Sequence, residues 1–173
     1  MGMGSVVIPE THGGPRGIGH GGYVVGLLAG NVAGAAQVTL RKPAPLGVAL
    51  DVVLTENAWE LRSGDDVIAD ATSTVLDLAV PRAPSLDEAR AAEEKSPSRW
   101  NETGVHPTCF GCALFRDDDL GLAIGTGPLQ VDGIDMVAAA WRPRATHADA
   151  SGVVDPHIVV AAIDCTGDME FIA

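Results

Sequence analysis

Glycine crowds one stretch of the sequence, and this stretch limits what the first half of the chain can fold into. Residues 11–22 read Thr-His-Gly-Gly-Pro-Arg-Gly-Ile-Gly-His-Gly-Gly, a run that cannot hold regular structure and predicts a loop. Residues 23–34 are apolar nearly all round and predict a helix, although their internal glycines would weaken that helix in isolation. Those glycines also let another backbone approach closely, so we expect this helix to be buried.

An antiparallel meander is predicted after the helix. Residues 37–41 alternate polar and apolar side chains and stop before Pro43. Residues 50–61 form a longer alternating run, a hairpin turn is indicated at 63–66, and residues 67–78 return as a further strand. One core is expected to collect these side chains of the helix and strands: Leu27, Leu28, Val38, Leu40, Val52, Trp59 and Leu61.

The sequence divides into three parts. Residues 1–80 form a first unit, residues 81–105 a linker, and residues 106–173 a second unit. The linker contains a short charged helix over 86–95, which starts at a capping box made by Ser85 and Glu88. Its charged side chains favour a solvated helix over one that packs on the core.

The second unit shows a different order of elements. Strands are predicted at 120–124 and 136–143, with a turn through 125–135 between them. A helix is predicted from His157 to about Asp164, because an Asp-Pro pair before it suits the first turn of a helix.

Composition and charge exclude several classes of partner. The chain has no uninterrupted apolar run of membrane-spanning length and no signal peptide at its start, so we expect a cytoplasmic protein with no membrane partner. Its net charge is −12, which disfavours nucleic acid because such a chain repels phosphate backbones. An anionic ligand such as coenzyme A would need a local basic patch, for which the candidates are Arg41, Lys42, Arg142 and Arg144. The alternative is that these four residues only keep the surface soluble.

The three cysteines are expected to be reduced, because their number is odd and no secretory signal precedes them. His106, Cys109 and Cys112 have metal-like spacing, and Cys165 or His157 would have to complete such a site. A structural zinc site usually draws its four ligands from two close pairs, and only one Cys-x-x-Cys is present. A buried thiol pair is therefore the preferred interpretation, and no metal is assigned.

The order of motifs resembles the hotdog fold, an α+β fold in which an antiparallel sheet wraps around a central helix. His20-Gly21-Gly22, at the start of the predicted buried helix, resembles the His-Gly-Gly motif of hotdog thioesterases. Residues 106–112, followed by Gly121-Leu122 and Trp141-Arg-Pro, resemble the opening of another hotdog unit. The resemblance covers most of the chain outside the linker and implies two hotdog units, in tandem or permuted, of the acyl-CoA thioesterase superfamily.

The resemblance implies a hydrolytic site. In the family, a backbone N–H in the first turn of the central helix faces the thioester carbonyl, and a carboxylate further along such a helix activates water or attacks directly. The first helix here has His20, Gly21 and Gly22, but no acid where one is expected. The second has Asp164 at about the acid position but lacks the His-Gly-Gly motif. A composite site is predicted, with Asp164 from one unit and the other three residues from its neighbour; His20 would fix the turn or contact the substrate. The alternative is that Asp164 caps a helix end before Cys165.

The sequence is compatible with three functions. The first is hydrolysis of acyl-CoA thioesters, with coenzyme A entering as part of the substrate rather than as a resident cofactor. The others are non-catalytic binding of an acyl ligand and a structural role in an assembly. The second unit lacks the strands that should follow its helix. Either the sequence is a fragment of a longer tandem protein, or the opening strands of the second unit complete the sheet of the first. An uncovered apolar face would predict a homo-oligomer.

Overall fold

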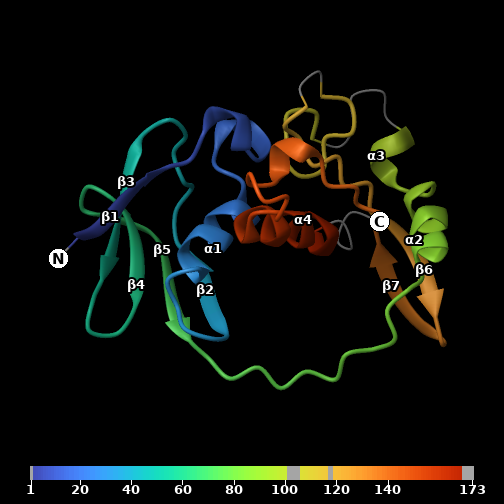
Figure 1. The fold of residues 1–173 in the computed structure, drawn as a ribbon, viewed down its shortest axis with the longest axis horizontal. Coiled ribbons are helices and arrows are strands. Elements are labelled where there is room, and N and C mark those ends of the chain that lie inside the picture. The colour runs from blue at the N-terminus through green and yellow to red at the C-terminus, as the bar shows by residue number, and fades with distance from the viewer. Residues whose placement is uncertain (1, 101–105, 117–118, 169–173) are drawn as a thin grey trace.

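The computed structural model describes residues 2–100, 106–116 and 119–168. Within these residues the chain is an α+β protein with a five-stranded antiparallel sheet, a separate two-stranded sheet, and two helices from the two halves of the chain that pack against each other. Figure 1 shows these two helices between the sheets, with residues 74–85 running as an extended segment from the end of β5 to the start of α2.

All strands of the larger sheet come from the first part of the chain. In the order in which they pair, they are β1 (Gly2–Val7), β3 (Ala49–Leu54), β4 (Trp59–Ser63), β5 (Asp66–Ser73) and β2 (Ala36–Leu40). The meander predicted from the sequence is confirmed, but its long run over 50–61 is two strands. Thr55 closes a turn between them, since its N–H and its hydroxyl both donate to the carbonyl of Ala58. The N-terminal strand β1 had not been expected.

Helix α1 (Gly21–Ala29) packs against this sheet and ends earlier than predicted. The side-chain amide of Asn31 donates to the carbonyl of Leu27 at 3.0 Å, which satisfies an end group that a longer helix would have used. Of the predicted core, three residues are fully buried and three pack partly buried against them: Leu28, Val52 and Leu61, then Leu27, Val38 and Trp59. The prediction for Leu40 is wrong, because this residue ends the edge strand β2 beside a surface cavity and is 47% exposed.

Helix α4 (Pro156–Asp168) lies along α1 at very short range. A Cβ atom added to Gly22 would lie 2.4 Å from Asp164 Cβ, and one added to Gly26 would lie 2.7 Å from His157 Cα. The two glycines are four residues apart and therefore share one face of α1. The expectation that the glycines of this helix let another backbone approach closely is thus confirmed.

The second half of the chain corrects several predictions. Residues 120–124 form no strand, because Leu122 N–H donates to Phe110 and Ile124 N–H to Gly111, which ties this segment to the loop of the cysteines. The predicted turn over 125–135 instead contains a strand and a tight turn. The strands here are β6 (Gly127–Val131) and β7 (Ile134–Ala138), joined by Asp132-Gly133 with both residues at positive φ, as a two-residue hairpin requires.

The two short strands β6 and β7 pair only with each other within the described residues, so they do not complete the first sheet as one prediction proposed. They pack against α2 (Leu86–Glu93), which begins at the predicted capping box of Ser85 and Glu88 and is followed by α3 (Pro97–Trp100). Contrary to the solvated helix expected, α2 buries Ala89 and Ala92 against this hairpin. Among the described helices, none has the length and apolar character needed to cross a membrane.

Candidate functional site

The start of helix α1 meets the later turns of helix α4. The N–H of Gly22 donates to Oδ2 of Asp164 at 2.8 Å. Because α4 continues to Asp168, Asp164 lies inside its helix and does not cap the end of it. Its carboxylate instead binds the N-terminus of the other helix, where the helix dipole favours negative charge. The Asp164 side chain is 33% exposed, so water can reach it.

His20 is the cap residue of α1 and is almost completely buried. Its Nδ1 accepts the N–H of Tyr23 at 3.4 Å, and the same nitrogen lies 3.9 Å from Oδ2 of Asp164. Its Nε2 points the other way and lies 3.1 Å from the sulfur of Cys165. His20 therefore fixes the helix start through a backbone hydrogen bond, which is one of the two roles predicted for it, and links that start to a residue of α4.

Most of the backbone N–H groups at the start of α1 donate to an acceptor within the protein, and that of Gly21 differs from them. Gly22 donates to Asp164, Tyr23 to the ring of His20, and Val24 to the His20 carbonyl. Among the described residues no hydrogen bond reaches the N–H of Gly21. An N–H at the first position of a helix that has no protein partner is a donor that a ligand can use.

A cavity of about 300 Å³ opens beside Gly21. Its lining is mainly apolar and includes Val24 and Leu40, with Arg41 and Lys42 among its polar members. A Cβ on Gly21 would lie 3.4 Å from a Leu40 methyl and 3.5 Å from Oδ2 of Asp164, so this glycine adjoins both the cavity wall and the carboxylate.

The four basic residues predicted to bind coenzyme A fall into two places. Arg41 pairs with Asp70 and Lys42 with Asp66, and both cations are about half exposed. Surface pairs of this kind contribute little free energy, so either cation is able to exchange its carboxylate for a phosphate. Arg142 and Arg144 line a second cavity of about 290 Å³, which shares no lining residue with the first.

A third cluster, which we call the thiol cluster, consists of His20, Cys109, Cys112 and Cys165. All four residues are buried, and the cysteines are free thiols. The hydrogen bond with Cys112, and then that with Cys165, holds the pKa of Cys109 far below its ordinary value. The neighbouring Cys109 raises the pKa of Cys112 to about 12.

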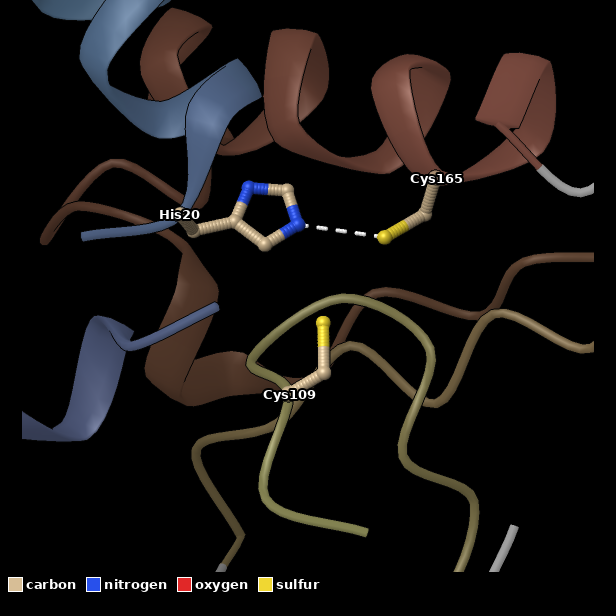
Figure 2. Close-up of side chains that lie close together, drawn as sticks. All are labelled: His20, Cys109 and Cys165. Carbon is tan, nitrogen blue, oxygen red and sulfur yellow. Dashed lines mark hydrogen bonds between the residues drawn. The ribbon is translucent and has the colours of Figure 1, made fainter. Parts of the chain in front are cut away.

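Sequence reasoning had grouped the cysteines with the wrong histidine. His106 is close to them in sequence, but the histidine whose ring reaches the sulfurs is His20. Figure 2 shows its Nε2 directed at Cys165, with the sulfur of Cys109 pointing toward the space between them. His20 and Cys165 are 145 residues apart, and no spacing in a single sequence signals such a contact.

Comparisons with protein-family models, curated proteins and solved structures found no match for this chain.

Proposed function

We propose that this chain is a hotdog-fold hydrolase of acyl-CoA thioesters, with its site between the start of α1 and Asp164 of α4. The observation that carries the proposal is the 2.8 Å contact between Gly22 N and Asp164 Oδ2. This contact brings together the glycine motif at the start of α1 and the carboxylate of α4, which are the two parts of the predicted composite site. The cavity is lined by the neighbouring Gly21, and neither Gly22 nor Asp164 is among its lining residues, so a substrate in it would approach the contact from the side of Gly21.

The fold supports the hotdog assignment in two respects. A helix that follows a glycine loop packs on an antiparallel sheet whose later strands form a meander, as the resemblance implies. The helix of the second half packs against it at backbone range, which is the arrangement that a pair of related units requires for a composite site.

In the proposed reaction, the thioester carbonyl oxygen accepts the N–H of Gly21, which carries no other partner among the described residues. Asp164 takes a proton from water, and the water oxygen bonds to the carbonyl carbon. The tetrahedral intermediate then collapses, the carbon–sulfur bond breaks, and the proton passes from Asp164 to the departing thiolate. The products are a carboxylic acid and coenzyme A, and Asp164 is again ionised.

Gly22 has a positioning role in this mechanism. Its N–H donates to one carboxylate oxygen of Asp164, whose side chain is 33% exposed. This hydrogen bond holds the carboxylate at the start of α1.

Substrate binding is assigned to the cavity beside Gly21. The acyl group would lie against Val24 and Leu40, and the phosphates of coenzyme A would pair with Arg41 and Lys42 at the same cavity. Arg142 and Arg144 line the other cavity and have no place in this arrangement.

A second candidate function is non-catalytic binding of an acyl ligand. One observation favours it: Asp164 already occupies the N–H of Gly22, so an oxyanion would find fewer donors than the two amides of the motif suggest. A protein that only binds would need the cavity and its cations but not an ionised Asp164 facing water.

The two functions are separated by measuring hydrolysis and binding on one panel of acyl-CoAs with short, long, branched and aromatic acyl groups. Loss of thioester absorbance measures hydrolysis, and calorimetry with non-hydrolysable thioether analogues measures binding. The hydrolase proposal predicts turnover of at least one member above the rate of a heat-denatured control. Binding without turnover would favour the second function, and neither binding nor turnover would contradict both.

A further inference from the structure

Four side chains with metal-binding atoms converge behind the start of α1, away from the cavity assigned to the substrate. Nε2 of His20 and the sulfurs of Cys109 and Cys165 all lie within 4.8 Å of one another. Cys112 is buried three residues after Cys109 on the same loop, and Cys109 and Cys165 are the neighbours that shift the pKa of its thiol. These groups come from three separate segments: the loop before α1, the loop over 106–116, and α4.

From this geometry we propose that His20, Cys109, Cys112 and Cys165 form a binding site for a divalent zinc ion. Zinc with about 2.3 Å bonds to sulfur and about 2.0–2.1 Å to nitrogen holds its ligand atoms within about 4 Å of one another. His20 Nε2 lies 3.1 Å from Cys165 Sγ, and the ligand atoms of His20, Cys109 and Cys165 lie within 4.8 Å of one another, which is close to such an arrangement. Three thiolates and one imidazole form a soft, four-ligand set of the kind that selects zinc.

The loop that carries two of these cysteines is shaped for this close approach. A Cβ on Gly111 would lie 2.1 Å from the Cys165 sulfur and 2.7 Å from His20 Nε2, so only glycine fits at position 111, next to Cys112. Backbone hydrogen bonds also join this loop to two other segments. The Phe110 N–H donates to the Gly13 carbonyl in the loop before α1, and the Gly111 carbonyl accepts the N–H of Ile124. The ligands are thus held near one another by contacts that do not depend on an ion.

Asp164 is suited to orient the histidine. When Nε2 binds a metal, the proton of the ring lies on Nδ1, and a carboxylate or carbonyl normally accepts it. Nδ1 of His20 lies 3.9 Å from Asp164 Oδ2, close enough for a small rotation of the ring to make that bond. The weak 3.4 Å bond from Tyr23 N–H to the same atom would be given up.

The role of the ion follows from its ligand set. With four protein ligands it has no open position for water or substrate, so it is structural. It would join the start of α1 to α4 and to the cysteine loop, and thereby fix the helix end that carries Gly21 and Gly22. The proposal does not depend on hydrolysis, because metal content is measured without a substrate.

The test measures metal in the intact chain, produced in zinc-supplemented medium with a tag that does not bind metal and purified without chelator. Elemental analysis should find close to one zinc per chain. Replacement by Co²⁺ should give the strong visible bands of a tetrahedral site together with sulfur-to-cobalt charge transfer. Cys165→Ser and His20→Asn should each lose most of the zinc. His106→Ala is the matched control, since His106 lies in the same loop but outside the cluster, and should keep it.

Three results would overturn the proposal. The first is that the wild-type protein retains no zinc after exposure to zinc and desalting, and shows no sulfur-to-cobalt charge-transfer band after exposure to cobalt. Another is a Cys109–Cys112 disulfide in the purified protein, detected by intact mass under non-reducing conditions. The third is loss of zinc in His106→Ala. If the cysteine variants fail to fold, the cobalt spectrum of wild type still decides, because an octahedral spectrum without sulfur ligands contradicts the site.

Discussion

The close approach of α1 and α4 is tested by placing a methyl group at Gly22. In Gly22→Ala the new Cβ would lie 2.4 Å from Asp164 Cβ and 2.9 Å from Ala161 Cα, whereas carbon atoms in contact are about 3.5–4.0 Å apart. Neither neighbour is the end of a flexible side chain, so the helices themselves must separate by roughly 1 Å. The hydrogen bond from Gly22 to Asp164 would stretch with them.

Three free-energy terms decide the size of the effect. Forcing an extra carbon into a packed interface costs about 1–3 kcal/mol. Weakening a hydrogen bond to a charged group costs up to about 1.5–3 kcal/mol. Replacing glycine by alanine inside a helix returns about 0.5–1 kcal/mol. With the hydrogen bond lost, we therefore expect a net loss of about 1.5–5.5 kcal/mol, which for a chain of this length lowers the thermal midpoint by roughly 3–22 °C.

Gly30→Ala is the matched control for that variant. Gly30 follows the same helix with φ −60°, and a Cβ there would meet no atom closer than 3.6 Å. Its thermal midpoint should stay unchanged or rise slightly, because alanine restricts the unfolded chain. Thermal unfolding followed by circular dichroism compares the two variants. A Gly22→Ala midpoint equal to or above that of Gly30→Ala would refute the helix contact.

Other predictions concern the core, the cations and the assembly. Leu28→Ala should destabilise the chain by about 2–5 kcal/mol, while Leu40→Ala, at a residue 47% exposed, should cost far less; equal denaturation midpoints would count against the core described here. Replacing Arg41 and Lys42 together by alanine should raise the KM for acyl-CoA with little change in kcat, because both cations would bind the phosphates equally well in the ground state and in the transition state. An unchanged KM would show that these two residues do not bind the substrate. Light scattering at micromolar concentration should show a dimer, and a monomer there would end the oligomer prediction.

The first half of the fold was largely predictable from the sequence. Alternation and turn residues located the meander, and the glycine content of the first helix predicted a close backbone neighbour. The one error in the core, Leu40, arose because alternation assigns a face to a side chain but does not show that a cavity opens over that face.

The second half was harder to predict, although one signal was present. Asp132-Gly133 between apolar residues is a strong hairpin pattern and lies within the turn predicted over 125–135, but the strand before it was predicted at 120–124 and lies at Gly127–Val131. That segment is held instead by backbone bonds to the cysteine loop, contacts that propensity does not encode.

The candidate site was predictable only in part. The composite site of Gly22 and Asp164 was expected only from the resemblance to hotdog thioesterases. The grouping of His20 with the cysteines was not accessible, because it depends on how three distant segments meet in space.

We propose that Asp164 activates water at the start of α1, and Asp164→Asn tests this role. This change keeps the shape of the side chain and its bond to Gly22 N–H through the amide oxygen, but removes the charge. Asp51→Asn, an equal change at an exposed strand residue far from the helices in the sequence, is the control.

The measurement is the rate of hydrolysis of the best acyl-CoA substrate at saturation, with folding of each variant checked by circular dichroism. We expect kcat to fall by about 100-fold or more in Asp164→Asn, within the usual contribution of a general base, and to stay unchanged in Asp51→Asn. A folded Asp164→Asn variant that keeps kcat within about threefold of wild type, a difference near 0.7 kcal/mol, would contradict the account.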